Sequence, residues 1–161
     1  MNCKLRIGLG HDTHRLESGG PLRLGGIDIP FDKQAVGHSD ADVLLHAITD
    51  AILGAAALGD IGEFFPDTDP ANRGKDSAEM LSDAADAVSK ASYRIANIDC
   101  VVLAERPKLL PHREAIRARI AGLLNVDSEC IGLKGKTGEQ TGPVGRNEII
   151  QAMVVCLIEK I

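Results

Sequence analysis

Apolar residues recur at every third or fourth position from Asp40 to Leu58, which predicts an amphipathic helix ended by Gly59. The positions that set this period are Val43, Leu44, Ala47, Ile48, Ala51, Ile52 and Ala55. Ser39 stands directly before the helix and is a suitable N-cap. Residues 76–92 and 111–124 show the same period and predict two further helices.

A second pattern, in which apolar and polar residues alternate, predicts β-strands between these helices. It is clearest over residues 95–104, and shorter extended runs fall at residues 6–10, ending at Gly10, and at 131–134. Residues 148–161 fit either a helix or a strand, but their many Ile and Val residues favour a long strand. Residues 21–31 form two short runs around Gly25-Gly26, which indicates a β-hairpin.

Helices thus alternate with strands along a chain of 161 residues, a length that fits one domain. We therefore expect a single α/β (α+β) domain over residues 1–161, built on one mixed sheet with helices on one face. The other face of such a sheet would remain apolar and open. We expect oligomerisation to bury it.

The composition excludes several classes of function. Eighteen basic and 23 acidic residues give a net charge of −5, which argues against a nucleic-acid or anionic-membrane partner. Aromatic residues make up only 2% of the chain, too few for a platform that stacks bases. No apolar run is long enough to span a bilayer, and we expect no targeting segment before the first strand.

The cysteines indicate the cellular compartment. Cys3, Cys100, Cys130 and Cys156 lie far apart, without a CxxC motif. We interpret them as buried thiols in a reducing environment, and we expect a cytoplasmic protein.

Three residues form a candidate metal site. Asp12 and His14 are two apart in an extended segment, so their side chains face the same way. His46 lies on the predicted helix, where Asp42 and Asp50 share its stripe and can orient an imidazole. Imidazole and carboxylate ligands suit zinc better than manganese or iron, and three protein ligands leave one position open for catalysis.

Three other segments have both a structural and a functional interpretation. His38-Ser39 can cap the predicted helix and can add to a phosphate site at its N-terminus, and the two roles are compatible. The run KGKTGE at 134–139 is either a turn or a phosphate site with a magnesium ion on Glu139, although the full P-loop pattern is absent. Residues 104–111 are either a proline-bounded connector or a nucleotide pocket.

Five segments carry a resemblance to a known family. They read GHDTH at 10–14, GHSDADVLLHAITDAILGAAALGDIG at 37–62, FFPDTDP at 64–70, ERPKLLPHR at 105–113 and GEQTGPVGR at 138–146. With them the sequence resembles, over essentially its whole length, the 2-C-methyl-D-erythritol 2,4-cyclodiphosphate synthases of the non-mevalonate isoprenoid pathway. The resemblance implies a homotrimeric enzyme with active sites between subunits. It implies conversion of 4-diphosphocytidyl-2-C-methyl-D-erythritol 2-phosphate to the cyclic diphosphate, with release of CMP.

The resemblance also implies roles for individual residues. Asp12, His14 and His46 would bind zinc, and Glu139 would hold magnesium or manganese with the substrate phosphates. His38 and Thr137 would stabilise the transition state. The residues implied to contact the substrate are Ser39, Asp60, Ile61, Gly62, Phe65, Pro66, Asp67, Thr68, Asp69, Ala104, Glu105, Arg106, Pro107, Lys108, Leu109, Leu110, Lys136, Gly138 and Arg146.

Two other functions fit parts of the sequence. A zinc hydrolase of phosphate esters would activate water at the open zinc position, with Asp42 or Asp50 as the base. A non-catalytic trimer would bind a nucleotide or an isoprenoid diphosphate and use zinc only to join the strand to the helix. The identity of the phosphorus-containing product distinguishes these functions.

Overall fold

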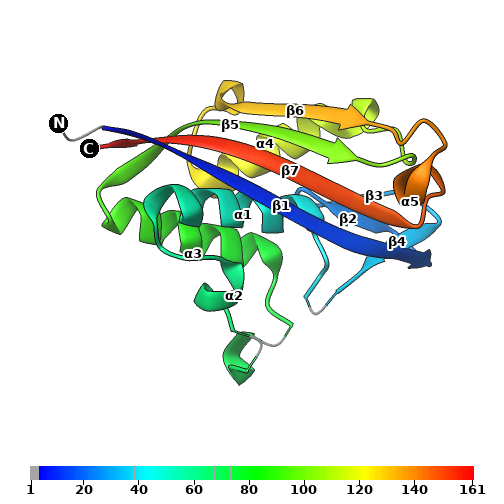
Figure 1. The fold of residues 1–161 in the computed structure, drawn as a ribbon, viewed down its shortest axis with the longest axis horizontal. Helices are drawn as coiled ribbons and strands as arrows, with labels where there is room; N and C mark the ends of the chain where they lie inside the picture. Colours follow the sequence, from blue (N-terminus) through cyan, green and yellow to red (C-terminus); the bar gives the residue numbers. More distant parts are fainter. Residues whose placement is uncertain (1–3, 38, 67, 73) are drawn as a thin grey trace.

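The computed structural model describes residues 4–37, 39–66, 68–72 and 74–161, and its centre is a five-stranded mixed sheet ordered β4–β1–β7–β5–β6 (Figure 1). The strands are β1 (Leu5–Ser18), β4 (Lys33–Val36), β5 (Tyr93–Leu103), β6 (Ile131–Lys136) and β7 (Ile149–Lys160). Neighbours run antiparallel except β5 and β6, which are parallel. The α/β class and the mixed sheet are confirmed. A separate two-stranded sheet of β2 (Leu22–Leu24) and β3 (Ile27–Ile29) is the predicted hairpin.

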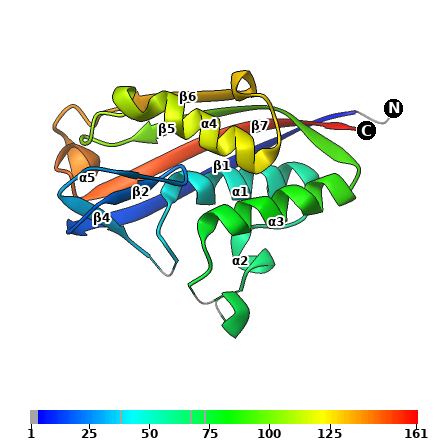
Figure 2. The same ribbon diagram turned by 180° about the vertical axis from the view of Figure 1, so that it is seen from behind.

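The three long helices are α1 (Val43–Ala56), α3 (Ser77–Lys90) and α4 (Arg113–Leu124), and all lie on one face of the large sheet (Figure 2). Short helices are α2 (Ile61–Phe64) and α5 (Gly142–Gly145), and 3-10 turns span Pro70–Asn72, Leu110–His112 and Ser128–Cys130. Among the residues that the structure describes, no helix combines the length and the apolar character needed to cross a membrane.

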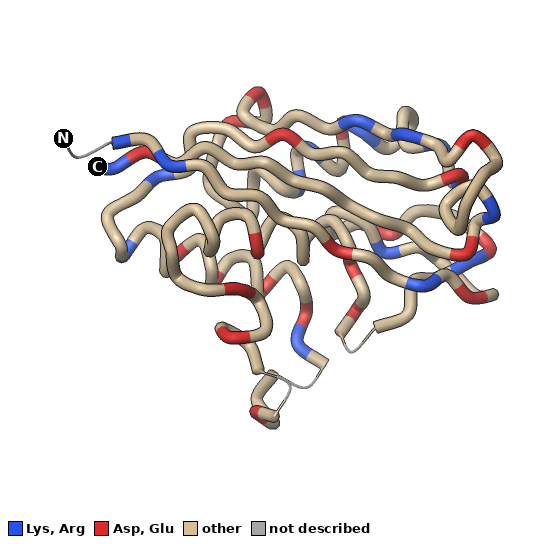
Figure 3. Tube along the Cα trace, in the orientation of Figure 1, with Lys and Arg blue, Asp and Glu red and all other residues tan. Residues whose placement is uncertain are grey.

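Strand alternation decides which side chains these helices cover. On β7, the side chains of Ile150, Ala152, Val154, Cys156 and Ile158 are buried. The residues between them face away, and Met153 and Val155 are 45% and 48% exposed. Ile7 and Leu9 of the neighbouring β1 are 73% and 66% exposed. Figure 3 shows few charged residues along the middle of β1 and β7, and the exposed Ile7, Leu9, Met153 and Val155 make this open face apolar there.

Helix α1 packs directly against β1 because two residues of the strand lack side chains. A Cβ atom on Gly10 would lie 1.8 Å from the carbonyl oxygen of Ala47, and one on Gly8 would lie 1.9 Å from that of Ala51. Gly10 is therefore a contact point within the strand. Our prediction that the first strand ends there was wrong, since β1 continues to Ser18.

The buried carboxylate of Asp42 joins the hairpin to α1. Its two oxygens accept from the backbone N–H groups of Gly25 at 2.9 Å and Gly26 at 2.7 Å, and it also caps α1 through the N–H of Leu45 at 3.0 Å. Burial raises the pKa of Asp42, although these three hydrogen bonds oppose the shift. Asp42 rather than Ser39 is thus the N-cap, and the helix begins three residues later than predicted.

The cysteines follow the expected pattern in part. Cys100 and Cys156 are buried, whereas Cys130 is only partly buried, and Cys3 lies outside the described residues. Burial raises the pKa of the Cys100 thiol to about 12 and that of Cys156 to about 11. Both thiols therefore stay protonated near neutral pH and are poor nucleophiles and metal ligands.

Candidate functional site

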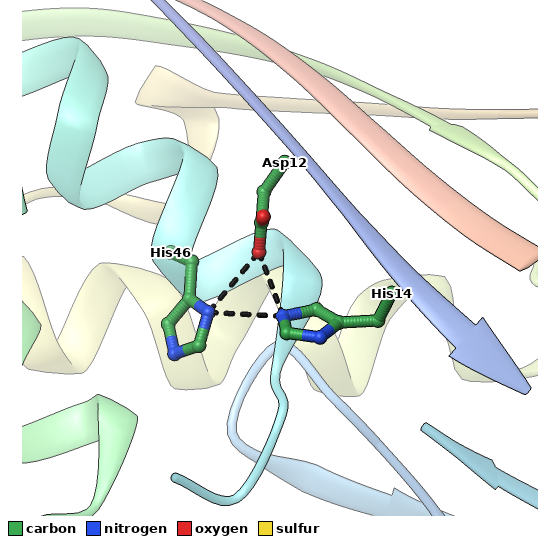
Figure 4. A group of neighbouring side chains, drawn as sticks. All are labelled: Asp12, His14 and His46. Atoms are coloured by element: carbon green, nitrogen blue, oxygen red, sulfur yellow. Dashed lines mark hydrogen bonds and ion pairs between the residues drawn. The ribbon is translucent and has the colours of Figure 1, made fainter. Parts of the chain in front are cut away.

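Strand β1 and helix α1 bring Asp12, His14 and His46 together, with their polar ends pointing toward one another (Figure 4). The ligand atoms, one from each residue, all lie within 4.8 Å of one another. Oδ2 of Asp12 is 2.9 Å from Nε2 of His14 and 3.1 Å from Nδ1 of His46, and these two nitrogens are 3.2 Å apart. The structure thus assembles the three residues that the sequence singled out. Asp12 and His14 lie within β1, whereas the predicted first strand ended before them, at Gly10.

The charges of this triad are strongly coupled. Burial alone would raise the pKa of Asp12, but hydrogen bonds with His14 and His46 outweigh it and hold that pKa well below its usual range. Burial lowers the pKa of His14, yet the neighbouring Asp12 carboxylate raises it by more, so the net shift is upward. A metal ion can bind the ring nitrogen of such a histidine only when the proton leaves it, so the ion and the proton compete for the same nitrogen atom.

The far nitrogen of His14 determines which ring atom faces the triad. Nδ1 of His14 lies 2.8 Å from the carbonyl oxygen of Val36, which can only accept a hydrogen bond. Nδ1 therefore carries the hydrogen in the neutral ring, and Nε2 directs its lone pair at Asp12. Acceptor atoms that converge in this way repel one another unless a cation lies between them. The donor set therefore fits a metal ion.

The far nitrogen of His46 is held by hydroxyl groups. Its Nε2 atom lies 2.7 Å from Oγ of Ser77 and 3.0 Å from Oγ of Ser39. We expected Asp42 or Asp50 behind this ring, and that prediction was wrong. Asp42 binds the hairpin, and Asp50 accepts from the backbone N–H of Ile61 at 2.8 Å, so it fixes the start of α2.

A pocket of about 250 Å³ opens beside the triad. Its lining residues are His14, Ser39, His46, Ile61, Gly62, Phe65, Asn72 and Met80. Four of these, Ser39, Ile61, Gly62 and Phe65, belong to the predicted substrate contacts. Sequence reasoning missed Asn72 and Met80 as lining residues, although Met80 lies within one of the predicted helices.

The remaining predicted contacts of this region shape the loops around the pocket. Asp60 caps α2 by accepting from the N–H of Glu63 at 2.8 Å, and the carbonyl oxygen of Pro66 accepts from the Asn72 side chain at 3.1 Å. Asp69 accepts from the N–H of Ala71 at 2.9 Å, and Thr68 is exposed. His38 and Asp67, also predicted for the site, lie outside the described residues.

A second pocket, of about 380 Å³, lies between the β5–α4 connection and the end of β6. Its lining residues are Ala104, Pro107, Lys108, Leu109, Leu110, Arg113, Leu133, Lys134, Gly135, Lys136 and Thr137. The pocket therefore brings together the predicted phosphate segment, residues 134–139, and the predicted nucleotide segment, residues 104–111. Arg113 and Leu133 were missed, although Arg113 lies two residues beyond the segment 104–111, at the start of α4.

Several other predicted residues do not line this second pocket, but most have defined partners. Oε2 of Glu105 accepts from the N–H of Gly138 at 3.0 Å, which ties the two segments to each other. Oγ1 of Thr137 donates to Glu139 at 3.1 Å. The exposed Arg146 is paired with Glu148 at 2.7 Å, and Arg106 precedes Pro107 in the connection.

The two pockets are separate within one chain. Lys136 lies opposite Leu103, which lies opposite Gln151, which in turn lies opposite Thr13 beside the triad. Three strand spacings of roughly 4.8 Å therefore put Lys136 about 14 Å from β1. In the described part of the chain, no residue lines both pockets. One chain alone does not bring Thr137 next to the triad.

Comparisons with known proteins agree with this arrangement. The model of the YgbB family matches residues 5–159. The 2-C-methyl-D-erythritol 2,4-cyclodiphosphate synthase of Chromobacterium violaceum is 56% identical over 95% of this chain and 97% of its own length. A solved synthase of the same name, in a form bound to CDP, superposes with a TM-score of 0.89 at 42% identity, over 96% of this chain and 100% of its own.

A longer protein contains the same fold. The bifunctional IspDF of Campylobacter jejuni superposes with a TM-score of 0.93 at 39% identity, over 98% of this chain and 42% of its own. These matches extend over nearly the whole chain, and they therefore show its family. The chain belongs to the YgbB family, together with proteins named 2-C-methyl-D-erythritol 2,4-cyclodiphosphate synthase.

Proposed function

We propose that this chain converts 4-diphosphocytidyl-2-C-methyl-D-erythritol 2-phosphate into 2-C-methyl-D-erythritol 2,4-cyclodiphosphate and releases CMP, as a phosphorus–oxygen lyase of isoprenoid biosynthesis. The observation that carries the proposal is the triad of Asp12, His14 and His46 in the wall of a pocket. The names of its relatives and the CDP bound to one of them support the same activity. We further propose that residues 1–161 act as one synthase domain in the cytoplasm.

The proposed reaction needs positioning rather than a nucleophilic side chain. An oxygen of the 2-phosphate attacks the β-phosphorus, and the bond from that phosphorus to the oxygen of the departing CMP breaks. The substrate supplies its own nucleophile, so the protein has to align the phosphates and neutralise their charge.

The described residues fit the two metal ions that such a reaction uses. Asp12, His14 and His46 would hold zinc, because two imidazole lone pairs and a carboxylate face one point. Glu139 would hold magnesium or manganese with the phosphates, because its carboxylate is exposed and can share a hard cation with phosphate oxygens. Bound there, the ions supply positive charge and polarise phosphorus–oxygen bonds.

The second pocket suits the cytidine half of the substrate. Ala104, Leu109 and Leu133 provide apolar walls for a flat base, and Lys108 and Lys136 provide positive charge for phosphate. Thr137 adds a hydroxyl at the same end. His38 retains its proposed role in stabilising the transition state.

We propose that each active site forms between two subunits of a homotrimer. Lys136 of the nucleotide pocket lies about 14 Å from the strand that carries Asp12 and His14, so a neighbouring subunit is needed to bring such a pocket beside the triad. The open apolar face of β1 and β7 provides a surface for such association. The family resemblance supplies the number three.

Hydrolysis of a phosphate ester is less well supported. It requires a free base beside the triad, and the two nominated residues have other partners. Asp42 is fully buried and accepts from three backbone N–H groups, whereas Asp50 is bonded to the N–H of Ile61. The non-catalytic trimer remains a second alternative, which a turnover experiment separates from an enzyme.

Phosphorus NMR of the purified protein with its substrate, zinc and magnesium tests the proposed reaction. We expect the two doublets of a cyclic diphosphate to appear together with an equal amount of CMP. Inorganic phosphate in their place would indicate the hydrolase, and unchanged substrate would indicate the binding protein.

Replacing Thr137 with valine should lower turnover by about 10²–10³-fold, the usual cost of losing one hydrogen-bond donor to a transition state. Valine keeps the branched shape, so we expect CMP affinity and melting temperature to change little. Steady-state kinetics, CMP titration and a thermal melt on one sample measure all three. Thr141→Val is the control, because the Thr141 hydroxyl donates to the carbonyl oxygen of Gly138 at 2.8 Å and only holds the loop. Equal losses in both variants would reduce Thr137 to the same structural role.

Sedimentation equilibrium should give about three times the chain mass of 17.1 kDa. Ile7→Lys should shift the protein toward smaller species, because it would bury an ammonium group in the proposed interface. Activity should fall with the loss of the trimer, since each site would lack its second subunit. A stable and active monomer would contradict both the trimer and the shared site.

A further inference from the structure

Ser77, the first residue of α3, is completely buried although its side chain is polar. Its Oγ atom lies 2.7 Å from Nε2 of His46, and it donates a hydrogen bond to Oδ1 of Asp40. The sequence marked this serine only as part of a helix start. Oγ of Ser39 is a third side-chain neighbour, at 3.5 Å. The hydrogen bonds with His46 and Asp40 connect Ser77 to the triad and to the segment that leads into α1.

The chemistry of the hydroxyl fixes the direction of these two hydrogen bonds. A serine hydroxyl has one hydrogen to donate, and a carboxylate can only accept. The hydrogen of Ser77 therefore goes to Asp40, and its oxygen accepts from His46. In the neutral ring of His46, Nε2 then carries the hydrogen and Nδ1 keeps its lone pair. Nδ1 is the atom that faces Asp12 at 3.1 Å.

Asp40 is itself held in place from several sides. Its carboxylate accepts from the backbone N–H groups of Ser77 and Asp42, each at 3.3 Å. Nε of Arg23, on β2, lies 3.8 Å from its Oδ2 atom. Asp40 thus fixes the orientation of Ser77 relative to the start of α1, and it leaves the hydroxyl little freedom to turn toward His46 as a donor.

Ser39 provides a second oxygen at the same ring nitrogen. Its Oγ atom lies 3.0 Å from Nε2 of His46 and also accepts from the N–H of Ala41 at 3.4 Å. Ser39 lines the pocket beside the triad, so substrate can compete for its hydroxyl. Ser77 is shielded from substrate by its burial and keeps its contact with His46 throughout.

We propose that Ser77 is a positioning residue of the metal centre. Oriented by Asp40, it fixes His46 in the tautomer that has hydrogen on Nε2 and leaves Nδ1 free to bind the ion. This inference rests on the proposed function, because it assumes that the triad binds a metal. Outer partners of metal-bound histidines act in this way by fixing the ring orientation and the tautomer.

Zinc affinity, measured by competition with a chromophoric chelator, tests the inference without any turnover assay. Ser77→Ala should weaken zinc binding by about 10–100-fold, as loss of such an outer partner usually does. Ser89→Ala is the matched control, since it makes the same change at an exposed position of the same helix and should leave affinity unchanged. Ser39→Ala should have a smaller effect than Ser77→Ala.

The tautomer is measured separately, by long-range nitrogen–proton NMR correlations of the histidine rings in the metal-free protein. Wild type should show His46 with hydrogen on Nε2, and Ser77→Ala should show a mixture. This spectrum of wild type decides the question even if Ser77→Ala does not fold.

Three results would overturn the inference. They are hydrogen on Nδ1 of His46 in wild type, equal zinc affinity in Ser77→Ala and Ser89→Ala, and a greater loss in Ser39→Ala than in Ser77→Ala. If the triad does not bind a metal at all, the result is distinguishable from these three, because wild type itself would then bind no zinc. That result would contradict the inference as well.

Discussion

Replacing His46 with alanine should remove the bound zinc and lower turnover by at least about 10³-fold. Asp12 and His14 would remain as two ligands from the same strand, with no ligand from the helix. Two ligands do not close a zinc site that takes three from the protein. Loss of a single transition-state donor already costs about 10²–10³ in rate, and loss of the ion removes charge from all the phosphate oxygens that it neutralises.

Metal analysis of the purified protein, together with phosphorus NMR, measures both effects. Wild type should contain one zinc ion per chain, and His46→Ala should lack it. His11→Ala is the matched control for metal content, because His11 lies next to Asp12 but on the exposed face of β1. We expect it to retain the zinc. A His46→Ala protein with full metal content and wild-type turnover would exclude the triad as the metal centre.

Gly10→Ala should destabilise the fold by about 3 kcal/mol or more, the upper end of the usual cost of overpacking a core. The added Cβ atom would lie 1.8 Å from the carbonyl oxygen of Ala47 and 2.9 Å from the backbone nitrogen of Ala51. Both atoms belong to the backbone of α1, so no side chain can rotate to relieve the clash. The helix would have to move away from the strand and carry His46 with it.

A thermal melt at matched protein concentration measures this effect. At about 2–4 °C per kcal/mol for a chain of this size, Tm should fall by about 6 °C or more. Gly54→Ala makes the same change within α1, where a Cβ atom would meet nothing within 4 Å. It should be neutral or stabilise the helix by up to about 1 kcal/mol.

Zinc affinity measured on any folded Gly10→Ala protein tests whether the packing of α1 against β1 positions His46 in the metal site. It should fall, because His46 follows the helix while Asp12 and His14 stay on the strand. Wild-type stability and wild-type zinc affinity together would show that β1 and α1 do not meet as closely as the structure has them.

The sequence determined the elements whose signals are local. The helical period located α1, α3 and α4, and alternation located β5, because a side chain is buried or exposed according to the period of its own element. The many Ile and Val residues of 148–161 indicated the long β7, where the pattern alone left helix and strand open. Gly25-Gly26 indicated the hairpin, since both residues have the positive φ that its turn requires. The spacing of Asp12 and His14 put both on the same side of their strand, toward α1.

Only the tertiary structure decided the contacts between elements. The sequence indicated Ser39 as the helix cap, but Asp42 serves instead because it also binds two N–H groups of a hairpin 16 and 17 residues away. Gly10 looked like the end of a strand, because nothing nearby in sequence reveals the helix backbone that lies against it. Ser77 contacts His46 across 31 residues. Such partners are chosen by packing in space, and neither residue carries a sequence signal for the other.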